Sequence, residues 1–211
     1  MEIASIVERI FGTRSRVRVL GVLYRADVPL NASQIARRTG LSQPAVTTAL
    51  GELADIGLAK ASSAGRANVH WLVRDSIYVE QLVKIAFEFE SALPDMFEEE
   101  LRGMFASVAE SVVLFGSRAR GDDSADSDVD VVVVVEDAEA KQNLERSLLE
   151  VGDEFARCWG QPLSVIVYDV VEAAELGERA PAFYGSLLEE GVRISGLLPF
   201  EWKAAWGTEE Q

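Results

Sequence analysis

Two aspartates at the start of an apolar run carry the clearest chemical signal in the sequence. They lie in the stretch VVLFGSRARGDDSADSDVDVVVVV, where Asp128 and Asp130 lead into a run of valines. Alternate residues of a strand point to the same face, so the two carboxylates are expected side by side. Adjacent carboxylates repel each other, and a bound cation relieves that repulsion. Because the ligands are oxygens, we expect Mg²⁺ or Mn²⁺, bound by Asp128 and Asp130.

A glycine and a serine precede the aspartates, at the end of another apolar strand. The strand covers residues 112–115, and Gly116 and Ser117 follow it directly. Glycine allows the backbone to approach phosphate oxygens closely, and serine offers a hydroxyl and an N–H to the same oxygens. Two basic residues, Arg118 and Arg120, lie beside five aspartates. A bound triphosphate explains this basic pair better than solubility does; a solvated face is the alternative.

The spacing of these residues resembles the signature of the DNA polymerase beta-like nucleotidyltransferases, and within them the small minimal nucleotidyltransferases. That signature is Gly-Ser, a loop, then Ser-Asp-x-Asp, and the chain reads GSRARGDDSADSDVD. The matching positions are Gly116, Ser117, Ser127, Asp128 and Asp130. The resemblance covers about residues 92–197. It implies that the two aspartates are catalytic, that the glycine and the serines lie at the nucleotide, and that ATP donates a nucleotidyl group to a hydroxyl of a protein or small molecule.

One position departs from that signature. The family places an Asp or Glu on the third strand, where it completes the metal site and takes the proton of the attacking hydroxyl. Here the strand reads PLSVIVYDV, and Ser164 stands at the aligned position. Asp169 follows on the same strand, but alternation points it to the opposite face, so we expect the third acid to be absent. Nucleotide and one Mg²⁺ should still bind, while turnover should be slowed by roughly 100- to 10,000-fold, be missing, or use a carboxylate from elsewhere.

Charge divides the chain into two unlike parts. Residues 1–75 hold 10 Lys and Arg against 6 Asp and Glu, a net charge of +4, whereas residues 76–211 hold 10 against 29, a net charge of −19. Two domains with different partners explain this asymmetry. A basic N-terminal domain suits the phosphates of nucleic acid, although the whole chain is strongly acidic.

The basic part predicts two short helices followed by a hairpin. Asn31 is placed to cap a first helix that Gly40 ends, and Ser42 is placed to cap a second helix. Two extended runs follow, at residues 58–61 and 68–73, across a turn that reads SSAGRA. Helix, tight turn, helix and hairpin is the order of a winged helix-turn-helix.

The stretch ASQIARRTGLSQPAVTTALGELADIGL resembles small bacterial winged-helix regulators of the arsenic-repressor-like and multiple-antibiotic-resistance-like groups, over about residues 12–74. In such a fold the second helix enters the major groove of double-stranded DNA, and the wing contacts the minor groove or phosphates. The candidates are polar side chains opposite the apolar stripe and the arginines of the wing and first helix. The expected DNA-binding residues are Gln43, Thr47, Thr48, Arg66, Arg37 and Arg38. A winged helix used for protein contact or dimerisation is the alternative.

Apolar periodicity predicts the elements around these motifs. Helices are expected over residues 77–90, 94–108 and 138–159, a strand over 163–168, and a C-terminal helix over AFYGSLLEEGVRIS. The predicted fold class is α+β. It comprises a winged helix-turn-helix domain at 1–75, a connecting helix at 76–91, and a nucleotidyltransferase α/β domain with a small mixed sheet at 92–211.

Two residue types occur once each in the sequence. Cys158 shares a helix face with Val151 and Phe155, so we expect it to be buried in the core. His70 lies in the second wing strand, where packing or a phosphate contact is a better explanation than catalysis.

Composition excludes several classes of protein. Hydrophobic residues make up 48% of the chain, which excludes disorder of the whole chain. The longest apolar run, residues 131–135, is too short to span a membrane. The N-terminal stretch MEIASIVERIFGTRSR lacks the basic segment and continuous apolar core of a secretory signal. We therefore expect a cytoplasmic protein with no membrane partner.

Three functional interpretations follow. The first is an enzyme, a DNA-binding nucleotidyltransferase that transfers AMP from ATP. The second is a transcriptional regulator whose transferase domain is weak or inactive and senses nucleotide or binds a partner, as Ser164 permits. The third follows from the resemblance, because minimal nucleotidyltransferases pair with a small helical partner protein in toxin–antitoxin modules. A homodimer is expected, since winged-helix proteins usually read paired half-sites.

Overall fold

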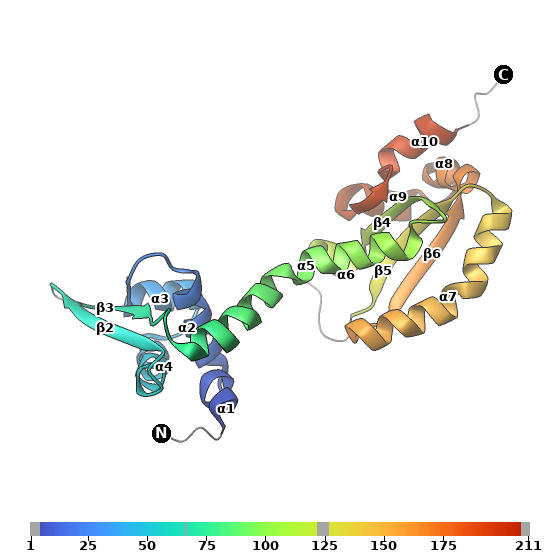
Figure 1. The fold of residues 1–211 in the computed structure, drawn as a ribbon. Coiled ribbons are helices and arrows are strands. Elements are labelled where there is room, and N and C mark those ends of the chain that lie inside the picture. The colour runs from blue at the N-terminus through green and yellow to red at the C-terminus, as the bar shows by residue number, and fades with distance from the viewer. Residues whose placement is uncertain (1–4, 66, 122–126, 208–211) are drawn as a thin grey trace. The chain divides into compact units, whose positions relative to one another are not determined.

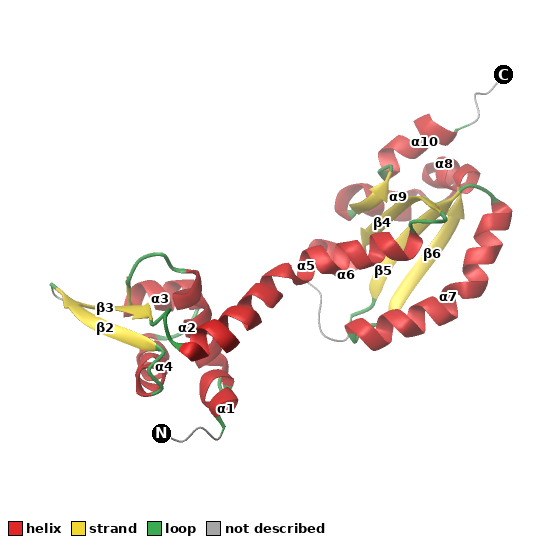
Figure 2. Ribbon diagram, in the orientation of Figure 1, coloured by secondary structure: helices red, strands yellow, loops and turns green. Residues whose placement is uncertain are grey.

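The computed structural model describes residues 5–65, 67–121 and 127–207. The chain divides into two compact units, Met1–Leu93 and Pro94–Gln211, and each is described by itself (Figure 1). Both units combine helices with strands, so the predicted α+β class is confirmed (Figure 2). No helix in the described part of the chain is long and apolar enough to cross a membrane.

The first unit joins short helices to a small antiparallel sheet. Its elements are α1 (Ile6–Phe11), α2 (Arg14–Arg25), β1 (Leu30–Asn31), α3 (Ala32–Thr39), α4 (Gln43–Asp55), β2 (Ala59–Ala64) and β3 (Ala67–Leu72). The strand order is β1-β3-β2, and β2 and β3 form the hairpin predicted as the wing. A π-helical turn at Val79–Val83 follows and leads into α5 (Lys84–Phe105), which begins in this unit and ends in the second.

Side-chain caps fix the two helices of the helix-turn-helix. Asn31 Oδ1 accepts a hydrogen bond from the Gln34 N–H at 2.9 Å, and Gln34 Oε1 accepts one from the Asn31 N–H at 2.8 Å. Gly40 ends α3 with φ 69°, a conformation that favours glycine. Ser42 Oγ accepts from the Ala45 N–H at 3.4 Å where α4 begins. The predicted caps are confirmed, and local sequence therefore sets the turn between the helices.

One apolar core holds the first unit together. Each helix contributes a stripe of buried side chains, and the strands contribute their inner residues: Ile10, Leu20, Leu23, Leu30, Ile35, Val46, Leu50, Leu53, Leu58, Leu72, Val83 and Phe87. The last two belong to the segment expected as a separate connecting helix, residues 76–91. Phe87 stacks on Tyr24 with ring centroids 5.4 Å apart, so this segment packs within the first unit.

The second unit is built around a four-stranded mixed sheet. Its elements are β4 (Ala109–Phe115), α6 (Gly116–Arg120), β5 (Val129–Val135), α7 (Ala138–Trp159), β6 (Leu163–Asp169), α8 (Val170–Arg179), α9 (Pro181–Glu190), β7 (Val192–Gly196) and α10 (Pro199–Trp206). The strand order is β6-β5-β4-β7. β4 runs antiparallel to β5 and β7, and β5 runs parallel to β6.

Helices cover both faces of this sheet. The odd-numbered valines of β5 pack against α5 and α7, together with Phe105 and Phe155. The even-numbered valines pack toward α8, α9 and α10, together with Leu187 and Trp202. Burial on both faces explains why the valine run is uninterrupted. By the same alternation, Asp130 lies on the face that α8, α9 and α10 cover.

The two helices expected over 77–90 and 94–108 are not separate elements. The structure has one helix, α5, that continues through Pro94 to Phe105. A proline inside a helix removes one backbone hydrogen bond and favours a kink, but it does not always end the helix.

The helix expected over AFYGSLLEEGVRIS is wrong in its second half. α9 ends at Glu190, and residues Val192–Gly196 form β7 beside β4. A Cβ at Gly191 would lie 2.3 Å from the Leu187 carbonyl oxygen, so the chain turns tightly there. After the turn, β-branched Val192 and Ile194 follow the two-residue period of a strand.

The expected burial of Cys158 is also wrong, because its side chain is exposed. The buried stripe of α7 continues from Phe155 to Trp159 instead, four residues along the helix. Phe97 of α5 meets both rings edge-on, with centroid distances of 5.9 and 5.2 Å. Trp159 therefore packs against the core, whereas the apolar pattern had predicted that position for its neighbour Cys158.

Candidate functional site

The glycine–serine turn and the aspartates meet at one end of the mixed sheet. β4 ends at Phe115, which pairs with Asp130 near the start of β5. On the other side of β5, Asp130 pairs with Ser164 of β6. These residues form a row across three strands, and Gly116 begins α6 directly after the row. The fold therefore brings residues from three separate parts of the sequence into one site.

Gly116 and Asp130 are in direct contact. Gly116 has φ +76°, a conformation that L side chains rarely adopt. A Cβ at this position would lie 2.5 Å from Asp130 Oδ2 and 3.3 Å from its Cγ. The carboxylate thus packs against the bare backbone of the turn. Glycine is required at this position for two reasons: its φ angle is positive, and the Asp130 carboxylate fills the space that a Cβ would need.

The environment of Asp130 opposes its negative charge. Burial and the nearby Asp128 carboxylate raise the pKa of Asp130, and the Glu190 carboxylate adds to the increase. A hydrogen bond from the Ser164 hydroxyl and the charge of Arg120 lower the pKa in return. A cation at this site would favour the ionised form further.

The donor set fits a divalent cation that shares its coordination with a ligand. Asp130 is half-buried and Asp128 exposed, and both offer only oxygen atoms. Within residues 5–65, 67–121 and 127–207, no group of three or more His, Cys, Asp or Glu side chains is placed to hold a metal ion. Mg²⁺ is commonly bound by one or two carboxylates, with phosphate oxygens and water in the other positions. The metal role of the two aspartates stays a prediction.

The third strand offers a serine and no acid beside the aspartates. Ser164 is the direct neighbour of Asp130, whereas Asp169 pairs with Val135 at the far end of the same two strands. Asp169 instead caps α8, because its Oδ1 accepts from the Glu172 N–H at 2.8 Å. Asp169 therefore has a structural role, and the third carboxylate of the resembled signature is missing from its usual strand.

The two arginines of α6 lie on different sides of the helix. Residues two apart on a helix are separated by about 200°. The Arg118 guanidinium lies 4.1 Å from the centroid of Phe97 and donates to Gln161 Oε1 at 2.6 Å. Arg120 instead forms an ion pair with Glu190 of α9 at 2.5 Å. Packing contacts account for the position of Arg118, and nucleotide binding by either arginine stays a prediction.

Ser117 and Ser127 border the same end of the sheet. Ser117 is the second residue of α6, and Ser127 directly precedes Asp128. Both side chains are half-buried. Contact of either hydroxyl with a nucleotide stays a prediction.

The residues expected to bind DNA gather on α3 and α4 of the first unit. Gln43, Thr47 and Thr48 are exposed on α4, and Arg37 and Arg38 are exposed on α3. Gln43 Nε2 donates to Ser33 Oγ at 2.7 Å, and Thr47 Oγ1 donates to the Gln43 carbonyl at 3.0 Å. The sixth expected residue, Arg66, lies outside the described residues. DNA contact by these side chains remains a prediction.

A groove of about 690 Å³ separates α4 from the inner face of the wing. Its lining includes Arg37, Lys60, Asn68 and His70, with Gly51 of α4 on the opposite wall. Burial lowers the pKa of His70, which disfavours its charged form. Arg37 and Lys60 are the cationic residues of a lining that also includes apolar side chains such as Leu50 and Ala54.

Two family models match this chain, one in each of its two units. The model of the nucleotidyltransferase domain matches residues 95–194, and the model of the MarR family matches residues 13–67. The chain is a MarR-type winged helix joined to a nucleotidyltransferase domain. Both resemblances inferred from the sequence are confirmed at this level.

Similarity to individual proteins is weak. No curated protein matches the chain. Among solved structures, a toxin–antitoxin complex with AMP-PNP is 16% identical and covers 51% of this chain and 82% of its own, with a TM-score of 0.35. A mutant of ZitR from Lactococcus lactis is 19% identical and covers 68% of this chain and 75% of its own, also with a TM-score of 0.35.

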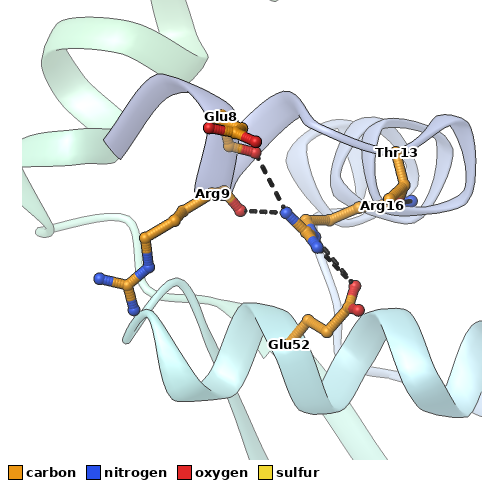
Figure 3. Close-up of polar contacts among 5 residues, drawn as sticks. All are labelled: Glu8, Arg9, Thr13, Arg16 and Glu52. Carbon is orange, nitrogen blue, oxygen red and sulfur yellow. Dashed lines mark hydrogen bonds and ion pairs between the residues drawn. The ribbon is translucent and has the colours of Figure 1, made fainter. Parts of the chain in front are cut away.

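One arginine that sequence reasoning missed holds the MarR-type domain together (Figure 3). Arg16 of α2 contacts Glu52 Oε2 through Nε and Nη2, both at 2.9 Å. Its Nη1 donates to the carbonyl oxygens of Arg9 at 2.5 Å and Glu8 at 3.3 Å. One side chain thus joins α1 to the last turn of α4. The Thr13 hydroxyl caps α2, the helix of Arg16, by accepting a hydrogen bond from the Arg16 N–H at 3.2 Å.

Glu190 is the second residue that sequence reasoning missed. It belongs to α9, far along the chain from the aspartate motif, and its place near Asp130 depends on the strand order. No local spacing signals such a contact. The acidic pair EE at the end of α9 was visible in the sequence, but nothing there distinguished Glu190 from the exposed Glu189.

Proposed function

We propose that this chain is a DNA-binding nucleotidyltransferase. Its second unit binds a nucleoside triphosphate with Mg²⁺ and transfers the nucleotidyl group, AMP from ATP, to a hydroxyl of a protein or small molecule. The observation that carries the proposal is the contact of Asp130 with the backbone of Gly116, beside Asp128, in a domain of this family. That contact brings one of the two proposed metal-binding carboxylates, Asp130, against the expected phosphate-binding turn.

The roles of the residues follow from their positions. Asp128 and Asp130 would hold the cation, which when bound neutralises charge on the phosphates. Gly116 and Ser117 face the phosphates through backbone and hydroxyl, with Ser127 at the other side of the turn. The acceptor oxygen attacks the α-phosphorus, and pyrophosphate leaves. The chain's contribution is to hold the two reacting groups together and to stabilise developing negative charge.

The first unit supports binding of double-stranded DNA. Its MarR-type fold exposes Gln43, Thr47 and Thr48 on the second helix of the helix-turn-helix, and Arg37 and Arg38 on the first. The positive net charge of residues 1–75 favours phosphate contact, in contrast to the rest of the chain. We propose that two copies bind paired half-sites as a homodimer.

A second candidate function is favoured by Ser164. Without a carboxylate on β6, the domain has the parts for binding a nucleotide but lacks the usual proton acceptor. The chain would then be a regulator whose nucleotidyltransferase domain senses nucleotide or binds a small helical partner protein, while the winged helix controls transcription.

Binding and transfer separate the two functions. Calorimetric titration with ATP and Mg²⁺ should give metal-dependent binding that Asp128→Asn and Asp130→Asn abolish. Labelled ATP with cell extract should give a labelled acceptor and pyrophosphate if the chain is a transferase. Binding without release of pyrophosphate would establish the regulator instead, and no metal-dependent binding of any nucleotide would refute both. A gel shift with genomic fragments at low salt tests the DNA-binding half.

A further inference from the structure

The strand order brings the end of α9 to the aspartate site. In the row across the sheet, Asp130 pairs with Phe115 at the end of β4. On the other edge of β4, Val192 pairs with Leu114, one residue before Phe115. Glu190 stands two residues before Val192, so it reaches the level where β4 passes into α6. The sheet therefore places Glu190 and Ser164 on opposite sides of Asp130.

Packing fixes Glu190 in this position. Leu187 of α9 is 1% exposed and belongs to the core on the face of Asp130. Phe183 of the same helix meets Phe115 edge-on, with centroids 5.4 Å apart. A Cβ at Gly191 would lie 3.0 Å from Val113 Cγ1, so the turn after Glu190 lies closely against β4. Glu190 thus belongs to the rigid frame of the site.

Arg120 forms an ion pair with Glu190 within electrostatic reach of Asp130. It pairs with Glu190 at 2.5 Å, and the Glu190 side chain is only 16% exposed. The charges of both residues act on Asp130, so all three groups lie within electrostatic reach. An arginine at the edge of a proposed triphosphate site offers planar donors that suit phosphate oxygens.

We propose that Glu190 supplies the carboxylate missing from β6, and that Arg120 holds it back until a triphosphate binds. The proposal rests on the proposed function. When the nucleotide enters, its phosphates take up Arg120 and the Arg120–Glu190 ion pair opens. Glu190 then accepts the proton of the acceptor hydroxyl. The acceptor O–H bond breaks as the oxygen–phosphorus bond forms, and the bond between the α-phosphorus and its bridging oxygen breaks, with its electron pair leaving on pyrophosphate.

Other carboxylates of the described chain fit this role less well. Asp169 caps α8 at the far end of β6. Asp128 belongs to the proposed metal pair. Glu172, the nearest acid to Asp169 along the chain, is held by Lys141 of α7 in an ion pair at 2.5 Å. Glu190 remains as the acid whose charge reaches Asp130 and whose partner is a phosphate-binding candidate.

Affinity for ATP with Mg²⁺ tests the ion pair independently of turnover. The proteins are the full-length wild type, Arg120→Ala, Glu190→Gln and the double variant, measured by calorimetry. Because Glu190 competes with phosphate for Arg120, Glu190→Gln should bind ATP about twofold to fivefold more tightly, the range expected for a partly exposed pair. With alanine at position 120, the Glu190 substitution should no longer change the affinity. Glu189→Gln, at the exposed neighbour on the same helix, is the matched control and should equal wild type.

Turnover should move in the opposite direction to affinity. Glu190→Gln should release pyrophosphate from labelled ATP roughly 100-fold more slowly or worse, despite binding more tightly, because a general base is lost. A purely structural ion pair would not produce tighter binding together with slower transfer.

The possible failures are distinguishable. If wild type binds no nucleotide, the proposed function fails, and this inference fails with it. If wild type binds ATP but Glu190→Gln matches Glu189→Gln, or keeps its effect when Arg120 is absent, the ion pair does not control binding and the inference is overturned. Unchanged turnover in Glu190→Gln, or a wild type that binds ATP without transfer, overturns the role of Glu190 as proton acceptor.

Discussion

The Ser164 hydroxyl donates a hydrogen bond to the carboxylate of Asp130, its direct neighbour across the parallel strands β5 and β6. This bond lowers the pKa of Asp130, while burial and the Asp128 carboxylate raise it. The serine therefore stabilises the charged aspartate at the position where an acid would repel it. In this site β6 stabilises the charge of Asp130 through Ser164, so any further carboxylate must belong to a different element of the domain.

Ser164→Asp should make the second unit depend on metal for its stability. The substitution replaces the hydrogen bond with like-charge repulsion, so without Mg²⁺ the free energy of unfolding should fall by about 1–3 kcal/mol. A cation bound only by the folded state should restore most of this loss. Thermal unfolding in EDTA and in Mg²⁺ measures both effects. Combined with Glu190→Gln, the same substitution should recover turnover. If Mg²⁺ does not change the unfolding temperature of Ser164→Asp, position 164 does not border a cation site.

Gly116→Ala should disrupt both halves of the site. The new Cβ would lie 2.5 Å from Asp130 Oδ2, and the residue would have to keep φ +76°. A left-handed conformation costs a non-glycine residue roughly 1–2 kcal/mol before any clash is counted. We expect lower stability and at least tenfold weaker binding of ATP with Mg²⁺ by calorimetry, a factor that corresponds to about 1.4 kcal/mol.

Gly103→Ala is the matched control for that substitution. Gly103 lies inside α5, and a Cβ there would meet nothing within 4 Å. Alanine favours a helix interior over glycine by about 1 kcal/mol, so this variant should be slightly more stable than wild type and bind ATP normally. If both alanine variants bind equally well, Gly116 does not form the phosphate-binding turn.

Asp130 should also make stability depend on pH. Burial and Asp128 raise its pKa in the folded state above the ordinary value of 3.8. The folded chain therefore holds this proton more tightly than the unfolded chain, and the resulting stabilisation is present below 3.8 and lost as the pH rises through the raised pKa. Asp130→Asn removes the titration. Without metal it should be more stable than wild type at neutral pH and comparable in acid, as chemical denaturation across pH would show; added Mg²⁺ should stabilise only wild type.

Local sequence determined a large part of the fold. Asn31 and Ser42 cap their helices as predicted, and α7 covers the predicted residues 138–159. These elements depend on contacts within a few residues, which periodicity and capping describe well. The Gly116 and Asp130 motif was recognisable for the same reason, since its spacing reflects a single connection between two adjacent strands.

Contacts between distant segments could not be predicted in this way. Residues 192–195 were expected as helix, and they form part of a strand only because β4 offers an edge for pairing. The position of Glu190 beside the aspartate site follows from that pairing. Cys158 was assigned to the core because Val151 and Phe155 suggest one apolar stripe. In the structure Cys158 is exposed, and Trp159 packs against Phe155 instead. In each case tertiary contacts decided between alternatives that the local pattern left nearly equal.

Arg37→Ala and Arg38→Ala should weaken DNA binding without changing sequence preference. Each phosphate contact that is lost should reduce the slope of log affinity against log salt concentration by about 0.9. Gln43→Ala should leave that slope unchanged and reduce discrimination between sequences, because its side chain faces the base edges in the proposed complex. Fluorescence anisotropy over a range of salt concentrations measures both quantities. Arg146→Ala, which removes one charge from α7 of the second unit, is the control and should match wild type. Equal slopes for the wild type and all four variants would place the DNA elsewhere.

Arg16→Ala should destabilise the winged helix more than any exposed arginine does. The Arg16 side chain is 12% exposed and bonds to Glu52 and to the carbonyl oxygens of Glu8 and Arg9 (Figure 3). Removing it leaves these acceptors without their donor, at a cost of about 2–3 kcal/mol. Arg25→Ala breaks an ion pair whose side chains are 54% and 60% exposed, and such a pair contributes at most about 1 kcal/mol. Thermal unfolding should therefore separate the two variants. DNA affinity should fall for Arg16→Ala alone, because Glu52 lies on α4, the helix proposed to enter the DNA groove. Equal unfolding temperatures would mean that α1 and α4 are held by their apolar stripes without help from this arginine.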